Sequence, residues 1–138
     1  MLFQHKPLIA RARTADGVFE LDVEAEVVLA EVDAAVDHER LELELPRLVA
    51  ASSSGATVVA LVDRRPPLLV SHDAGATWTE AGGGLPAGFD VAVHPDDPDR
   101  VLFAARNRVY LSTDGGRFWH ALAPELPDIE AVTWVREA

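Results

Sequence analysis

Two eight-residue stretches, 71–78 and 112–119, share the pattern S-x-D-x-G-x-x-W and lie 41 positions apart. We call them the first box and the second box. A serine hydroxyl beside a carboxylate is suited to catalysis, to metal binding or to holding a turn together. A hairpin turn directs backbone N–H groups inward, where a carboxylate can accept several of them. The turn is the simplest interpretation of the pattern.

The other two shared residues fit the same interpretation. Glycine adopts the positive φ of such a turn at little cost, and tryptophan can bury a large ring beneath it. We therefore expect a structural rather than a catalytic or metal-binding role for the residues of both boxes: Ser71, Asp73, Gly75, Trp78, Ser112, Asp114, Gly116 and Trp119.

Arginine pairs in two turns are the strongest candidates for ligand binding. Arg64 and Arg65 precede the first box, Arg106 and Arg108 precede the second, and Arg65 matches Arg106 in the repeat. Guanidinium groups bind carboxylates and phosphates through paired hydrogen bonds. If the two turns are neighbours, they form a site for an anionic ligand or an acidic peptide. The alternative is that they are solvated turn residues that offset nearby acids.

The remaining residue types do not assemble a reaction centre. The five histidines show no metal-ligand spacing, and no two carboxylates stand in a context that nominates a glycosidase pair. The glycine run 82–84 lacks the Lys-Ser/Thr that follows in a phosphate-binding loop. We expect no catalytic residue, no metal and no cofactor.

The repeat extends beyond the boxes into the elements that position them. Leu-Pro pairs recur at 45–46, 85–86 and 126–127. Apolar stretches at 58–62 and 68–70 lead to the first box, and those at 101–105 and 109–111 lead to the second. Stretches 48–51 and 91–93 fit innermost strands, and 132–134 fits the same slot one period later. Four short strands in about 40 residues form a propeller blade, so we predict an all-β fold of antiparallel four-stranded blades.

The N-terminal third reads as a degenerate blade. Strands are predicted at 8–13, 18–23, 27–32 and 41–45, whereas only Asp33 remains of a box. Residues 24–39 are also compatible with a helix, because apolar residues at 28, 29, 32 and 36 fall near one helical face. The flanking alternation favours strand. We thus expect one domain, 1–138, with blades at 8–46, 47–86 and 87–127 and an extra strand in 128–138.

Composition limits the partners. The 138 residues carry a net charge of −11 and no cysteine. Such acidity argues against nucleic acid, and no apolar stretch is long enough to span a membrane. The first residues lack a secretory signal, so we expect a cytoplasmic protein.

The two boxes resemble Asp-boxes, also called BNR repeats, and residues 91–101 resemble the usual lead-in to such a box. That family of β-propellers includes sialidases, sortilin-type receptors, cellulose- and xyloglucan-active glycosidases and photosystem II assembly factors. The resemblance covers 47 to about 135 and implies blades, with the boxes away from the binding face. A sialidase-like site would need a tyrosine nucleophile, and the only tyrosine, Tyr110, matches Leu69 and is expected to be a packing residue.

The chain length provides about three blades, which cannot close a ring of ordinary geometry. We expect two chains to complete a ring as a homodimer, with the extra strand free to cross to the partner. The predicted function is a noncatalytic scaffold that binds a protein, a peptide or an anionic ligand on the face opposite the boxes. Two alternatives stay open: a carbohydrate-binding module or sialidase-like remnant, and a structural half-propeller completed by another chain.

Overall fold

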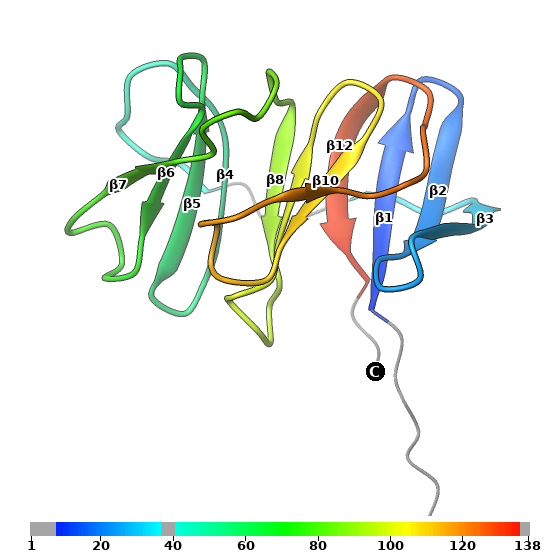
Figure 1. The fold of residues 1–138 in the computed structure, drawn as a ribbon, viewed down its shortest axis with the longest axis horizontal. Coiled ribbons are helices and arrows are strands. Elements are labelled where there is room, and N and C mark those ends of the chain that lie inside the picture. Colours follow the sequence, from blue (N-terminus) through cyan, green and yellow to red (C-terminus); the bar gives the residue numbers. More distant parts are fainter. Residues whose placement is uncertain (1–7, 37–40, 136–138) are drawn as a thin grey trace, which may run out of the picture.

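The computed structural model describes residues 8–36 and 41–135, and every regular element within these ranges is a β-strand. The strands form three antiparallel sheets of four strands each (Figure 1). The predicted fold class, all-β with four-stranded blades, is confirmed. None of the described segments is a helix that could span a membrane.

The first sheet joins the two ends of the described chain. Its order is β12 (Ile129–Trp134), β1 (Ile9–Thr14), β2 (Gly17–Asp22) and β3 (Val27–Val32). The strand interpretation of 27–32 is therefore right, and the helical alternative is wrong for that segment. Residues 37–40, which the helical alternative also included, lie outside the described residues.

Two expectations about this sheet need correction. Residues 41–45 form no strand, because β3 ends at the outer edge of the first sheet and the chain must cross from there to the inner edge of the second. The fourth strand of this sheet is instead β12, which lies at the inner edge and pairs with β1 through partners such as Ala12 and Val132, so that β3 is the outer strand. The last strand thus completes a sheet of its own chain.

The other two sheets follow the chain. The second sheet contains β4 (Leu48–Ser54), β5 (Thr57–Val62), β6 (Leu68–Ser71) and β7 (Thr79–Ala81). The third contains β8 (Asp90–Val93), β9 (Val101–Ala104), β10 (Val109–Ser112) and β11 (His120–Ala121). Leu69 pairs with Ala60 and Tyr110 pairs with Phe103, so Leu69 and Tyr110 occupy equivalent positions. Tyr110 packs edge-on against Phe103 with ring centroids 5.9 Å apart.

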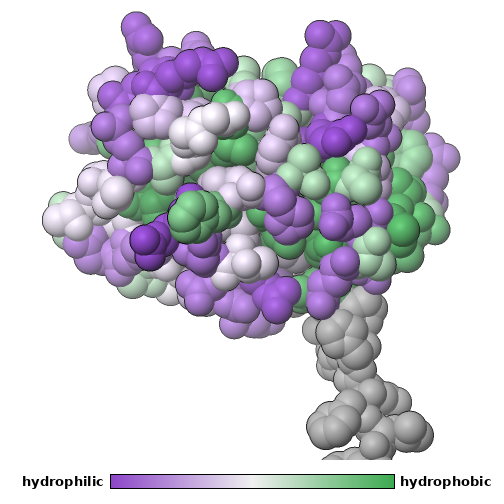
Figure 2. Space-filling model, viewed as in Figure 1, coloured by the Kyte–Doolittle hydropathy of each residue, from purple (hydrophilic) through white to green (hydrophobic). Residues whose placement is uncertain are grey.

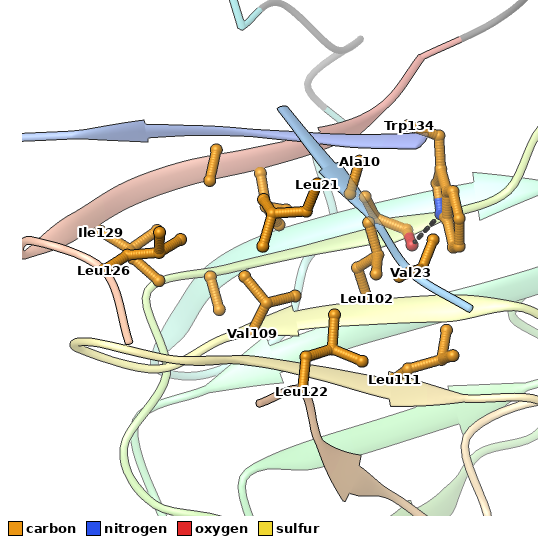
Figure 3. Packing of buried hydrophobic residues seen from close by; sticks show 14 residues of the cluster. Ala10, Leu21, Val23, Leu102, Val109, Leu111, Leu122, Leu126, Ile129 and Trp134 are labelled. Carbon is orange, nitrogen blue, oxygen red and sulfur yellow. Dashed lines mark hydrogen bonds between the residues drawn. The ribbon is translucent and has the colours of Figure 1, made fainter. Parts of the chain in front are cut away.

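The third sheet lies between the other two, because its side chains alternate between two hydrophobic clusters. Phe103 and Val101 belong to a cluster shared with the second sheet. Leu102 and Ala104 belong to a cluster shared with the first sheet, which includes Trp134 (Figure 3). The spatial order is therefore second, third, first, as Figure 1 shows from left to right.

Hydrogen bonds between side chains and backbone join the innermost strands of neighbouring sheets. Ser52 Oγ accepts a 2.8 Å bond from Val93 N, and Asp90 Oδ2 accepts a 2.9 Å bond from Val132 N. The two residues of the first bond are 41 positions apart in the sequence, and those of the second are 42 apart. Each bond therefore joins positions about one repeat period apart. β4, β8 and β12 consequently stand side by side around a common axis, as in a propeller.

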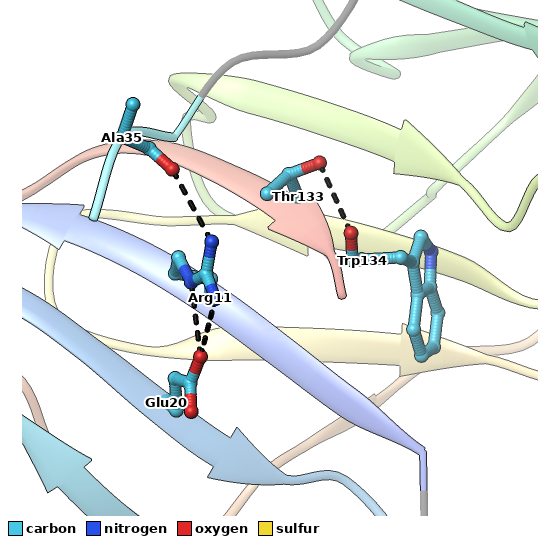
Figure 4. Close-up of polar contacts among 5 residues, drawn as sticks. All are labelled: Arg11, Glu20, Ala35, Thr133 and Trp134. Atoms are coloured by element: carbon cyan, nitrogen blue, oxygen red, sulfur yellow. Dashed lines mark hydrogen bonds and ion pairs between the residues drawn. The ribbon is translucent and has the colours of Figure 1, made fainter. Parts of the chain in front are cut away.

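The outer face of the first sheet is polar (Figure 4). Arg11 Nη2 lies 2.6 Å from Glu20 Oε2, and its Nη1 donates to the carbonyl of Ala35 at 3.5 Å. The segment after β3 therefore contacts this face. Beyond it, the edge strand β3 exposes Val27, Val28 and Leu29, and Figure 2 shows hydrophobic surface at the end that carries β2 and β3. A bulge in β3 bends that edge.

Candidate ligand-binding face

The first box forms a closed set of hydrogen bonds within one turn. Asp73 Oδ1 accepts a 2.8 Å hydrogen bond from Thr77 N, and Asp73 Oδ2 accepts a 2.5 Å hydrogen bond from Thr77 Oγ1. Ser71 Oγ donates to Asp73 Oδ1 at 2.7 Å and accepts from Gly75 N at 2.8 Å. Because the carboxylate is stabilised by these donors, the pKa of Asp73 is lowered to about 2, chiefly by the Thr77 hydroxyl.

The second box repeats this geometry. Ser112 Oγ donates to Asp114 Oδ1 at 2.8 Å and accepts from Gly116 N at 2.9 Å. Phe118 N donates to Asp114 Oδ1 at 3.0 Å, and this backbone bond is the largest cause of the lowered pKa of Asp114. Gly115 and Gly116 have φ of 76° and 97°, a region in which a side chain would be strained. Both carboxylates are thus engaged inside their own turns.

The two tryptophans differ in their surroundings. Trp119 packs against the cluster shared by the second and third sheets, with its ring 6.0 Å from that of Phe103, and its Nε1 donates to Gly116 O at 2.9 Å. Trp78 is half-buried against its own turn near Gly75. The second sheet is the end of the described row, and Trp78 is not among the residues packed against the cluster that Trp119 contacts.

The arginine turns and the boxes lie at opposite ends of the strands. Arg64 and Arg65 follow β5 and precede β6, whereas the first box follows β6. Consecutive turns of an antiparallel sheet fall at opposite ends. The same reasoning places Arg106 and Arg108 at the end opposite the second box. We call the end that carries these turns the arginine face.

The four arginines are not equivalent on this face. Arg106 Nε lies 3.3 Å from Asp128 Oδ1, and Arg108 Nη2 lies 2.9 Å from Glu125 Oε1. Asn107 Nδ2 donates to Leu126 O at 3.1 Å, so the turn is held by the loop before β12. Arg64 and Arg65 are exposed, and within residues 8–36 and 41–135 no carboxylate forms a salt bridge with them. The assembly of the two arginine pairs into one site stays a prediction.

The structure adds features of this face that the sequence analysis missed. Arg64 and Arg65 border a hollow of about 220 Å³, which Leu85 and Val49 also line. A larger hollow of about 500 Å³ lies beside the first residues of β4, β8 and β12. Val49 and Phe89, each 48% exposed, line this second space. Val49 and Phe89 are 40 residues apart, about one repeat period, and this spacing is the sequence signal that could have identified them as a pair.

No cluster of metal-binding side chains occurs in the part of the chain that the structure describes. No family model matches the sequence. No curated protein matches it either.

Two solved structures resemble the fold, and both are β-propeller proteins. A GH74 enzyme of Niastella koreensis superposes with a TM-score of 0.50 and 20% identity, over 89% of this chain and 19% of the enzyme. YCF48 bound to a D1 peptide superposes with a TM-score of 0.47 and 15% identity, over 87% of this chain and 44% of that one. This chain therefore spans less than half of either structure. The likeness to the GH74 enzyme supports the propeller-like fold alone.

Proposed function

We propose that this protein is a noncatalytic propeller-like scaffold that binds an acidic peptide or another anionic partner on the arginine face. The observation that carries the proposal is the state of Arg64 and Arg65. In a chain with a net charge of −11, two adjacent, exposed guanidinium groups border a hollow. Among the described residues neither is in a salt bridge with a carboxylate. Such groups are available to a carboxylate or a phosphate.

The boxes have a structural role in this proposal, in keeping with an Asp-box assignment. The carboxylates of Asp73 and Asp114 accept hydrogen bonds from their own turns, and these turns lie at the end opposite the arginines. A carboxylate whose pKa is lowered by such bonds stays ionised and makes a poor general acid. The proposal therefore assigns the two boxes to stability and the arginine face to binding.

Association of two chains into one ring is part of the proposal. Three sheets stand side by side around an axis, and ordinary propellers have at least four blades. In such a ring the outer face of the first sheet, with its Arg11 and Glu20 pair, would meet the outer face of the partner's second sheet. Light scattering should then give about twice 14.9 kDa. A mass of 14.9 kDa at all concentrations would contradict this part.

The test of binding uses Arg64→Gln combined with Arg65→Gln and a fluorescent glutamate nonapeptide as the probe. Loss of two charge-assisted contacts should weaken binding by about ten-fold or more. Arg106→Gln with Arg108→Gln is the matched control, since these side chains already have acidic partners, and it should change the affinity less. Unchanged binding by the Arg64 and Arg65 double variant would contradict the proposal.

A further inference from the structure

The two hollows of the arginine face adjoin one another. Val49 lines both of them. Gly88 lines the smaller hollow and the next residue, Phe89, lines the larger one. Together they give a space of several hundred Å³, which is the size of a ligand site. The shared wall makes them two parts of one surface.

The wall between the hollows is apolar and accessible. Val49 precedes Ala51 by two residues, and Phe89 precedes Val91 by two. Ala51 pairs with Ala60 and Val91 with Phe103, which are equivalent positions of β5 and β9, so Val49 and Phe89 are themselves equivalent. Each side chain is 48% exposed although both stand where an inner strand begins. A partner with a large apolar side chain would remove this surface from water.

The larger hollow is lined by charges of both signs, from Arg13, Glu42, Asp90 and Glu130, whereas the smaller hollow is mainly positive. Its charged residues are Arg64, Arg65 and Asp63, which leaves an excess of positive charge. Arg47 directly precedes β4, and its carbonyl accepts a 2.9 Å bond from Asp63 N. The backbone of Arg47 is therefore adjacent to this end of the groove. An apolar centre beside arginines is complementary to an apolar side chain followed by a carboxylate.

The chain itself shows what this surface accommodates. Leu41 and Leu43 line the larger hollow and are half-buried, whereas Glu42 and Glu44 are exposed. This segment lies there without joining any sheet. An extended stretch of alternating leucine and glutamate thus already fits part of the face, with its leucines less exposed than its glutamates.

Building on the proposed function, we propose that the two hollows form one groove for an extended acidic–apolar segment of a partner protein. A large apolar side chain contacts Val49 and Phe89, and a neighbouring carboxylate binds Arg64 and Arg65. The recognised chemistry is therefore that of the segment 41–45, supplied by another polypeptide.

The experiment measures fluorescence anisotropy with three labelled nonapeptides against the full chain. The first alternates leucine with glutamate, the second leucine with lysine, and the third serine with glutamate. The first should bind at least about ten-fold more tightly than the other two. Val49→Asp and Phe89→Ser should each weaken it by about ten-fold. Phe118→Ser is the matched control, because Phe118 is 75% exposed in the second box, and it should change nothing.

The outcomes separate this inference from the proposed function. Equal binding of the serine–glutamate peptide, with loss on replacing Arg64 and Arg65, would overturn the groove and leave an anion site. Equal binding of the leucine–lysine peptide, or no effect of Val49→Asp and Phe89→Ser, would also overturn the groove. Melting temperatures within about 2 °C of the parent protein verify that the exposed-site variants fold.

Discussion

The indole Nε1 of Trp134 donates a 3.0 Å hydrogen bond to the carbonyl of Ala92, 42 residues earlier in the chain (Figure 3). The bond connects the innermost strand of the first sheet to that of the third. Trp134 is 7% exposed and packs in the cluster that joins these sheets. Together with the bond from Val132 N to Asp90, this side chain therefore attaches β12, and with it β1, to the third sheet.

Replacing Trp134 should separate its packing from its hydrogen bond. Trp134→Ala is expected to lower the free energy of unfolding by about 3–5 kcal/mol, because a buried ring is lost from the cluster. Trp134→Phe keeps part of the ring but leaves the carbonyl of Ala92 without this donor, at a cost of about 1–3 kcal/mol. Urea unfolding followed by circular dichroism measures both. Equal and small losses of unfolding free energy in the two variants would show that Trp134 does not hold β12 against the third sheet.

The first box should make stability depend on pH at the acid end. The pKa of Asp73 is about 2 in the folded chain, against an ordinary value of 3.8. A lowered carboxyl pKa stabilises the fold above the unfolded pKa, and that contribution is lost as pH falls through the folded value. Asp73→Asn should therefore reduce the melting temperature near neutral pH. The difference from the parent protein should shrink between about pH 4 and about pH 2.

Melting curves recorded across that pH range test the assignment. Thr77→Val should act in the same direction as Asp73→Asn, because it removes the largest cause of the lowered pKa. Asp16→Asn is the control, since no hydrogen bond to the Asp16 side chain occurs among the described residues. A difference for Asp73→Asn that is constant with pH would mean that its carboxylate does not stabilise the turn.

The two box tryptophans should differ in their contribution to stability. Trp119→Ala removes contacts with the cluster shared by two sheets and should cost about 3 kcal/mol, while the contacts within a single chain give Trp78→Ala a cost of about 1–2 kcal/mol. Trp78 belongs to the second sheet, which is at the end of the row of sheets, and its ring lies close to Gly75. The comparison uses urea unfolding of each single variant. If Trp78→Ala proves as costly as Trp119→Ala, the second sheet has a neighbour on its outer face, as the proposed two-chain ring requires.

Periodicity made the sheets predictable, because each strand of the repeat buries the same positions. Predicted strands 58–62 and 109–111 lie within one residue of β5 and β10. The pattern also predicted an innermost strand at 132–134, but it did not specify the sheet to which that strand belongs. That choice depends on contacts over more than 100 residues, as in the pairing of Ala10 with Trp134.

The segment 41–45 shows a different limit. Alternation of leucine and glutamate fits a half-buried strand, and it fits equally a segment that lies with its leucines over an apolar hollow. At the candidate site, the arginines stood out by their chemistry. Val49 and Phe89 did not, because an apolar residue beside an inner strand is normally core, and only the folded loops show that both remain exposed.

The central claim is that the last strand closes the first sheet within the same chain. The sequence has no cysteine, so Arg11→Cys with Thr133→Cys introduces a single possible pair at positions that face each other in β1 and β12. Paired antiparallel residues lie within disulfide range. Oxidation at low protein concentration should give a disulfide inside one chain, with the mass still near 14.9 kDa on a non-reducing gel and a higher melting temperature. Disulfide-linked dimers, or thiols that stay reactive in the folded protein, would contradict the claim.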